Sequence, residues 1–266
     1  MGLYHSRPTV ADIRARKARG DKMTMLFVET PDEARAAAAA GIDMLSIIDP
    51  LWTPEMRAAA GDCFVQVGLL YGALVTEEDY LRAAHRVMAI GGDCVYCAAR
   101  MSVIRALCDE GIPVVSHVGL IPSKCTWTGG FRAVGKTAAQ ALDVWRHVQA
   151  LEDAGCFGAE LEVVPDRVGA EIARRSPLVF LGMGAGAGAD AQYLFAEDVL
   201  GTGVARRPRH AKRYRDFAAE YARLQAERIA AFGEFKADVA SGAYPAAEHV
   251  VPIADAEFAD FLAALD

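Results

Sequence analysis

The sequence has no hydrophobic run that approaches the roughly 18 apolar residues of a membrane-spanning helix. Its first stretch, MGLYHSRPTVADIRARKARGDKM, also lacks the apolar core of a secretion signal. Both absences lead us to expect a cytoplasmic protein without membrane association. Its six cysteines are then expected to be reduced thiols rather than disulfides.

Positive charge is also scarce. The chain carries 28 Lys and Arg against 35 Asp and Glu, which gives a formal net charge of −7. This balance argues against a broad binding surface for nucleic acid or for anionic membranes, because both attract cationic proteins. A small anionic substrate is compatible with it, since a single arginine can bind a carboxylate locally.

No linker, low-complexity tract or internal repeat interrupts the chain, so we expect one domain over residues 1–266. Short apolar runs alternate instead with longer amphipathic stretches, several of which end in a glycine suited to a left-handed helix cap. Eight runs predict strands: MTMLFVE (23–29), DMLSIID (43–49), CFVQVGLLY (63–71), CVYCAA (94–99), PVVSHVGL (113–120), CFGAELEVVP (156–165), LVFLGMGAG (178–186) and QYLFAED (192–198).

Repeated β–α units with continuously apolar strands predict a parallel sheet covered by helices. Eight such units in about 180 residues fit a single (β/α)8 TIM barrel with extra N-terminal and C-terminal helices. An open doubly wound sheet is the alternative. A long helix is expected over residues 209–241, and its apolar stripe should pack on the barrel or on a second subunit.

Chemistry in such a barrel lies at the C-terminal ends of the strands. Glu162 lies near such an end, and strand alternation puts Glu160 on the same face. A buried carboxylate raises the free energy of the folded state unless it is paired or has a function, and for Glu162 we favour general acid–base catalysis over a buried ion pair.

His117 is equally open to a catalytic and a structural role. Asp49 either binds a metal or substrate group or begins a turn before Pro50.

Three further segments invite a functional interpretation. The glycines of GMGAGAGAD (182–190) follow the seventh strand candidate rather than joining a first strand to a helix, so we reject dinucleotide binding. Cys94 and Cys97 should point to opposite faces of a strand, which argues against a chelating or redox pair. The loop PSKCTWTGG (122–130) is a candidate lid or a contact between subunits.

Several stretches carry a family resemblance: MTMLFVETPDEARAAAAAGIDML, SHVGLIPSKCTWTGGFRAVGKT, LEDAGCFGAELEVVP, LGMGAGAGADAQYLFAEDVLG, PRHAKRYRDF and SGAYPAAEH. They resemble the ketopantoate (3-methyl-2-oxobutanoate) hydroxymethyltransferase family, from about Thr9 to His249. The resemblance implies a barrel of the phosphoenolpyruvate mutase and isocitrate lyase type. It also implies hydroxymethyl transfer from methylenetetrahydrofolate to an α-keto acid, a divalent metal, usually Mg²⁺, that stabilises the enolate, and a homo-oligomer, commonly a decamer.

Three site residues follow from this resemblance. Glu162, in Leu-Glu-x-Val-Pro, takes the place of the family's catalytic glutamate. Asp49 takes the place of its first metal-binding aspartate, and His117 that of the histidine in His-x-Gly-Leu. These assignments imply a base and one metal ligand that also touches substrate.

The remaining family positions have changed. Pro50 stands where a substrate-binding serine is expected, and Gly68 where the second metal-binding aspartate is expected. Tyr96 and Ala98 stand in place of a lysine and a glutamate. A magnesium site would thus keep one carboxylate and lose two. The metal is left open: it could bind weakly with help from substrate, or a fixed protein donor could replace it.

Arg100 bears on this loss. Alternation puts it on the face of Tyr96 if the strand extends that far, where its guanidinium could clamp a keto-acid carboxylate. Tyr96 could then donate a hydrogen bond to an enolate oxygen. Otherwise Arg100 begins the next helix and faces solvent.

The leading hypothesis is a divergent enzyme that acts on an α-keto acid or a related carbonyl acid by enolate or aldol-type chemistry, with Glu162 as the base. Its substrate would be held by Asp49, Tyr96, Arg100 and His117. The alternative is a barrel that has lost catalysis and serves as a binding or assembly subunit.

Overall fold

A computed structural model describes residues 7–203 and 208–265 of the chain. Its eight parallel strands follow one another around a closed barrel, and the last pairs with the first. This confirms the predicted (β/α)8 barrel and rules out the open sheet. The strands are β1 (Met23–Phe27), β2 (Met44–Ile48), β3 (Phe64–Gly68), β4 (Cys94–Tyr96), β5 (Val114–Gly119), β6 (Gly158–Glu162), β7 (Val179–Met183) and β8 (Ala191–Phe195).

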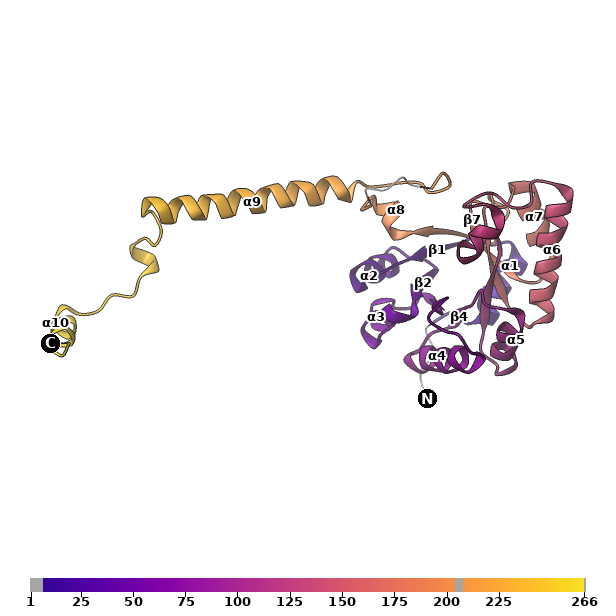
Figure 1. Ribbon diagram of the computed structural model, residues 1–266, viewed down its shortest axis with the longest axis horizontal. Helices are drawn as coiled ribbons and strands as arrows, with labels where there is room; N and C mark the ends of the chain where they lie inside the picture. Colours follow the sequence, from indigo (N-terminus) through magenta and orange to yellow (C-terminus); the bar gives the residue numbers. More distant parts are fainter. Residues whose placement is uncertain (1–6, 204–207, 266) are drawn as a thin grey trace. The chain divides into compact units, whose positions relative to one another are not determined.

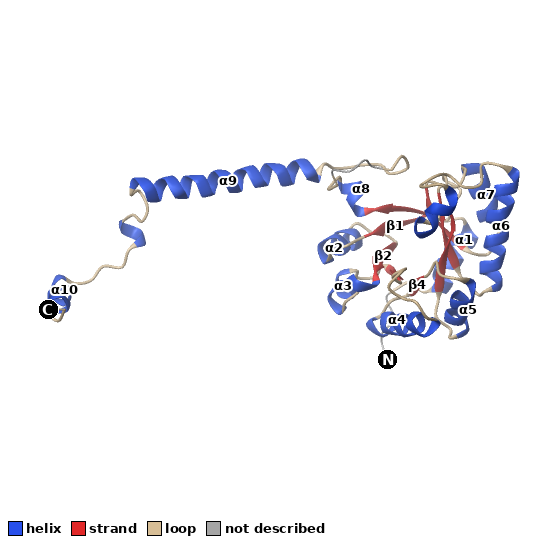
Figure 2. Cartoon of the chain, viewed as in Figure 1, coloured by secondary structure: helices blue, strands red, loops and turns tan. Residues whose placement is uncertain are grey.

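Helices surround the barrel strands (Figures 1 and 2). Two 3-10 turns, η1 (Asp49–Leu51) and η2 (Pro122–Thr128), follow β2 and β5. The helices of this unit are α1 (Val10–Arg19), α2 (Pro31–Ala39), α3 (Pro54–Ala59), α4 (Glu77–Ile90), α5 (Met101–Asp109), α6 (Ala138–Asp153), α7 (Asp166–Arg175) and α8 (Ala196–Leu200).

Threonine caps determine where many of these helices begin. In each case the hydroxyl accepts a hydrogen bond from the backbone N–H three residues later, which satisfies a donor that the helix leaves free. Each threonine thereby marks the residue at which its helix begins. The capping residues are Thr9, Thr30, Thr53, Thr76 and Thr137.

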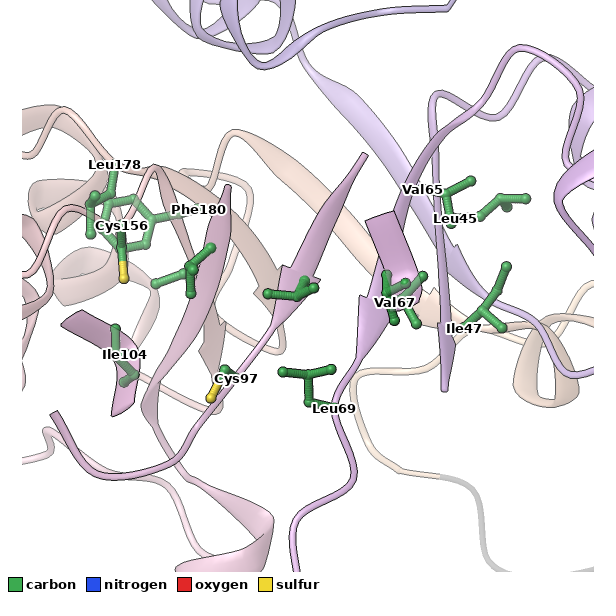
Figure 3. Packing of buried hydrophobic residues seen from close by; sticks show 14 of the residues in the cluster. Leu45, Ile47, Val65, Val67, Leu69, Cys97, Ile104, Cys156, Leu178 and Phe180 are labelled. Atoms are coloured by element: carbon green, nitrogen blue, oxygen red, sulfur yellow. The ribbon is translucent and has the colours of Figure 1, made fainter. Parts of the chain in front are cut away.

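The apolar core has two parts. The larger part lies between strands and helices and includes Leu45, Val65 and Phe180 (Figure 3). The smaller part joins side chains of the strands, such as Met25, to Ile13 of α1. This second cluster fills one part of the barrel interior with apolar side chains and leaves the polar groups together elsewhere.

The two cysteines of the Cys94-x-x-Cys97 motif belong to different parts of this core. Cys94 lies in the smaller cluster and Cys97 in the larger one. Both are free thiols. The prediction that they face opposite sides of the chain is confirmed.

Residues 216–266 form a second compact unit. It contains α9 (Phe217–Ser241), η3 (Ala247–His249) and α10 (Asp255–Ala263). The helix expected over 209–241 begins only at Phe217, where Asp216 caps it by accepting a hydrogen bond from the N–H of Ala219. Whether 1–266 is a single domain stays a prediction. In the described part of the chain, no helix combines the length and the apolar character needed to span a membrane.

Candidate functional site

A cavity of about 1430 Å³ lies at the C-terminal ends of the barrel strands. Barrel enzymes place their chemistry at this end. Each strand contributes at or near its end a residue that lines the cavity: Phe27, Ile48, Gly68, Tyr96, His117, Glu162, Met183 and Phe195.

His117 on β5 is the most highly connected polar side chain of this cavity, and it is only 1% exposed. Its Nδ1 lies 2.9 Å from the hydroxyl of Tyr96 and 3.2 Å from a carboxylate oxygen of Glu160. Its Nε2 lies 2.6 Å from the carbonyl oxygen of Leu120 and 3.3 Å from a carboxylate oxygen of Glu162. Both ring nitrogens therefore face oxygen atoms.

These contacts define the protonation of His117. A carbonyl oxygen can only accept, so the short contact to Leu120 requires a proton on Nε2. Burial by itself would lower the pKa of His117, but the hydrogen bonds and charges of Glu160 and Glu162 outweigh burial and raise that pKa from 6.5 to about 9. At neutral pH the side chain is therefore an imidazolium with protons on both nitrogens.

The pairing of β5 with β6 brings these groups together. In this register His117 lies beside Glu160, and Glu162 follows two residues later. Glu160 and Glu162 both line the cavity, whereas Leu161 between them belongs to the larger part of the core, between strands and helices. The predicted alternation along this strand is confirmed, since residues two apart on a strand share a face.

Glu160 is held from a second side by Gln66 of β3. The Gln66 amide nitrogen donates to Glu160 at 2.8 Å and lies 3.3 Å from the hydroxyl of Ser46. Gln66 is 1% exposed, and its amide oxygen has no hydrogen-bond partner within the described residues. No site role was predicted for Gln66, Glu160 or Ser46. Alternation within β2 and β3 was the signal that could have identified Gln66 and Ser46.

The backbone next to Glu162 is strained. Val163 has φ = +48°, which is rare for a β-branched residue. Its N–H donates to the carbonyl of Met183, and its carbonyl accepts from the N–H of Val134. Gly119 packs so closely on this turn that a Cβ atom there would lie 2.4 Å from the carbonyl oxygen of Glu162. Strained backbone held by its surroundings is common at functional sites.

Asp49 is not among the described residues that line the cavity. Strand β2 ends at Ile48, and Asp49 begins the 3-10 turn η1. The alternation of side chains along β2 therefore does not extend to Asp49. Both of its carboxylate oxygens contact the guanidinium of Arg86 on α4. The carboxylate predicted to bind metal or substrate is therefore engaged in an ion pair.

Arg100 also lies outside the described cavity lining. Strand β4 ends at Tyr96, so strand alternation no longer applies at Arg100. Arg100 is instead the N-cap residue of α5, is exposed, and donates from Nε to the hydroxyl of Ser102 at 2.9 Å. Of the predicted site residues, the structure thus brings together Glu162, Tyr96 and His117.

These residues do not fit a magnesium site. Within the described chain, no three His, Cys, Asp or Glu side chains are grouped so that they could hold a metal ion. Gly68 and Ala98, where the resemblance implies further ligands, line the cavity but have no donor side chain. Asp49 is paired with Arg86, and Glu160 and Glu162 face the His117 cation. Mg²⁺ prefers oxygen ligands in octahedral geometry, and these carboxylates already have cationic partners.

Solved structures share this fold. The crystal structure of 2,3-dimethylmalate lyase, a PEP mutase/isocitrate lyase superfamily member, aligns with a TM-score of 0.52 at 14% identity, over 87% of this chain and 89% of that one. Phosphonopyruvate hydrolase in complex with oxalate and Mg²⁺ aligns with a TM-score of 0.50 at 13% identity, over 97% and 98%. At these identities the likeness concerns the fold alone.

Sequence comparison is more specific. The family model described as ketopantoate hydroxymethyltransferase matches residues 51–247. The 3-methyl-2-oxobutanoate hydroxymethyltransferase of Nitratidesulfovibrio vulgaris (strain DP4) is 33% identical, over 97% of this chain and 90% of the relative. An enzyme of the same name from a strain of Thermus thermophilus is 33% identical, over 91% and 99%. The chain therefore belongs to the ketopantoate hydroxymethyltransferase family of enzymes.

Proposed function

We propose that this chain catalyses aldol-type carbon–carbon bond chemistry on an α-keto acid, with hydroxymethyl transfer as the specific reaction. One observation carries the proposal: the carboxylate of Glu162 lines the cavity at the end of β6 and lies 3.3 Å from a ring nitrogen of the buried His117. The relatives named 3-methyl-2-oxobutanoate hydroxymethyltransferases support a small branched keto acid as the substrate.

Glu162 is the proposed base. Its carboxylate removes a proton from the carbon next to the ketone, and the C–H electron pair becomes the double bond of an enolate. The negative charge that develops on the ketone oxygen is stabilised by Tyr96 and His117, which line the same cavity. The enolate carbon then attacks a one-carbon electrophile at the oxidation level of formaldehyde. This chemistry requires neither Asp49 nor Arg100, whose substrate-binding roles remain predictions.

The cavity has room for a second reactant. Its volume of about 1430 Å³ exceeds the roughly 300–1,000 Å³ that holds one drug-sized ligand. We propose methylenetetrahydrofolate as the one-carbon donor, because the family resemblance implies it. Formation of the hydroxymethylated product from 3-methyl-2-oxobutanoate and this donor is the direct test, and retro-aldol cleavage of that product tests the reverse direction.

Proton exchange tests the first chemical step without any donor. The protein is incubated in D₂O with a panel of α-keto acids that includes 3-methyl-2-oxobutanoate, and loss of the C–H signal next to the ketone is followed by NMR. Wild-type protein should catalyse exchange, and Glu162→Gln should slow it by about 100-fold or more.

The matched control is Glu110→Gln, which makes the same substitution at an exposed glutamate outside the described cavity lining. This variant should exchange at the wild-type rate. If wild-type protein exchanges none of the keto acids, the alternative of a binding or assembly barrel is favoured instead.

We also propose that the chain forms a homo-oligomer, a decamer by resemblance to its family. The second unit exposes large apolar side chains, which commonly mark contact surfaces. Sedimentation analysis of the full chain tests this, and a monomer at all concentrations would contradict it. The exposed apolar side chains of α9 and α10 include Leu224, Ile229, Phe232, Phe235, Val239, Phe258, Phe261 and Leu262.

A further inference from the structure

The cavity contains a hydrogen-bonded chain that runs from Gln66 through Glu160 and His117 to Tyr96. We infer that this chain supplies, at the ketone oxygen of the substrate, the positive charge and the directed hydrogen bond that a divalent metal would otherwise supply. Tyr96 would touch the substrate, and Glu160 would be a positioning residue that acts through His117. The inference rests on the proposed function and deepens it.

The direction of the Tyr96 hydroxyl is the first step. The Nε2 proton of His117 is used by the carbonyl of Leu120, so the only remaining donor of the ring is Nδ1–H. The Nδ1 atom that carries this proton lies 2.9 Å from the Tyr96 hydroxyl oxygen and 3.2 Å from a carboxylate oxygen of Glu160. With Nδ1 protonated, Tyr96 accepts from the ring and keeps its own proton free. The described residues give this hydroxyl no other hydrogen-bond partner, so its proton is available to a ligand in the cavity.

A neutral His117 would reverse this arrangement. With its single proton on Nε2, the ring would present a bare Nδ1 to Tyr96, and the hydroxyl would donate to it rather than to a ligand. The Nδ1 lone pair would also face the Glu160 carboxylate at 3.2 Å, which is repulsive. The charge on Glu160 therefore determines which way the Tyr96 proton points.

Gln66 indicates that Glu160 is held as an anion. The Gln66 amide directs its nitrogen to Glu160 and leaves its oxygen without a partner among the described residues, although both atoms are buried. Turning the amide over would bring its oxygen against the carboxylate. A buried amide that gives up a partner for its oxygen in order to donate to Glu160 fits a charged acceptor, since hydrogen bonds to charged groups are the stronger ones.

The charges balance through the enolisation step. Glu162 gains the substrate proton and becomes neutral, while the ketone oxygen gains the negative charge as its π electrons move onto it. His117 keeps its positive charge and Glu160 its negative charge throughout. The titratable groups that face His117 are Tyr96 from β4 and Glu160 and Glu162 from β6, and His147 of α6 is a more distant neighbour.

The first measurement is direct observation of His117. In full-length protein with ¹⁵N-labelled histidine, His117→Gln identifies its signals among the six histidines. Wild-type His117 should carry protons on both ring nitrogens at neutral pH. In Glu160→Gln, which keeps the size but removes the charge, its titration should move down by about one pH unit or more, because the nearest anion is lost. Glu110→Gln should leave it unchanged.

The second measurement is keto-acid proton exchange in excess EDTA. Wild-type exchange should change by less than about twofold, and Glu160→Gln should reduce it by about 10- to 100-fold. Tyr96→Phe should reduce exchange similarly but leave His117 doubly protonated, which keeps the test valid if Glu160→Gln fails to fold.

The outcomes separate the two proposals. Glu162-dependent exchange that EDTA abolishes and Mg²⁺ restores would overturn the inference but leave the proposed function standing. A neutral His117 in wild-type protein at neutral pH would overturn it in the same way. No exchange with any keto acid would overturn the proposed function and the inference with it.

Discussion

The guanidinium of Arg86 on α4 contacts both carboxylate oxygens of Asp49, the residue that follows β2. The Asp49 side chain is only 8% exposed, whereas that of Arg86 is 54% exposed. A carboxylate removed from water to this extent raises the free energy of the folded state unless a cation or hydrogen bonds compensate it. The pair therefore ties a helix to the end of a barrel strand.

Replacing Arg86 should destabilise the fold. Arg86→Gln leaves the buried Asp49 carboxylate without its cation, and we expect the free energy of unfolding to fall by about 1–3 kcal/mol. Urea unfolding followed by circular dichroism measures this. Arg82→Gln is the control on the same helix, because Arg82 pairs with Glu78 in solvent, and such pairs contribute about 0.5 kcal/mol or less. Equal effects of both substitutions would contradict a structural role for the Asp49–Arg86 pair.

Gly119→Ala should be much more damaging than the same substitution at Gly111. Both glycines have positive φ, 88° and 76°, so alanine costs about 1–2 kcal/mol at either position. Only at Gly119 would the new Cβ meet the carbonyl of Glu162, at 2.4 Å, whereas Gly111 has open space around it. We expect Gly119→Ala to lose about 1–3 kcal/mol more in urea unfolding. Similar losses would show that the turn next to Glu162 can relax.

Stability should depend on pH through His117. Although burial lowers the pKa of His117, Glu160 and Glu162 raise it from 6.5 to about 9, so the folded state binds this proton more tightly than the unfolded chain. The stabilisation is fully present below about pH 6.5 and is lost as the pH rises towards 9. At about 1.4 kcal/mol per pH unit, this amounts to about 3 kcal/mol.

Urea unfolding across that pH range gives the free energy of unfolding of the wild-type protein and of His117→Gln, and the quantity to follow is the difference between these two free energies. The difference should shrink as the pH rises from 6.5 to 9. His85→Gln, at an exposed position on α4, should follow the wild-type curve. A constant difference between wild type and His117→Gln would mean that His117 is not held as a cation.

The thiols should differ sharply in reactivity. Burial raises the pKa of Cys94 well above its usual value and that of Cys97 to about 11, so few thiolates form at neutral pH. Alkylation with iodoacetamide, read by mass spectrometry, should modify the partly exposed Cys125 much faster than the buried Cys94 and Cys97. Cys108 is also partly exposed, and its hydrogen bond with Cys156 lowers its pKa, so it should belong to the fast phase too. Cys125→Ser should remove only the share of that phase that Cys125 contributes. Rapid modification of Cys97, or a Cys94–Cys97 disulfide after mild oxidation, would contradict their burial in separate parts of the core.

Much of the barrel could be predicted from the sequence because its signals are local. Apolar runs and threonine caps report on short segments, and parallel strands joined by helices leave few arrangements open. The start of α9 was placed too early because the basic run 209–215 has no breaker, and only the cap at Asp216 marks the boundary.

The site was less predictable because it depends on where strands end. His117 and Glu162 followed from the strand-end rule. Asp49 and Arg100 do not line the described cavity, because β2 ends at Ile48 and β4 ends at Tyr96, before the chain reaches them. The contact of Glu160 with His117 depends on the register between β5 and β6, and that of Gln66 with Glu160 crosses the barrel interior. Neither relationship has a signature within one segment of sequence.

The left-handed residue after Glu162 has a mechanical consequence. Because the carbonyl of Val163 accepts from Val134 while its N–H donates to Met183, a single residue joins the loop before α6 to the end of β7. That loop also carries Arg132 and Lys136 along the cavity wall. Movement of the loop away from the barrel would have to break a backbone hydrogen bond one residue from the proposed base. A displacement of this loop would therefore disturb the backbone that positions the carboxylate of Glu162.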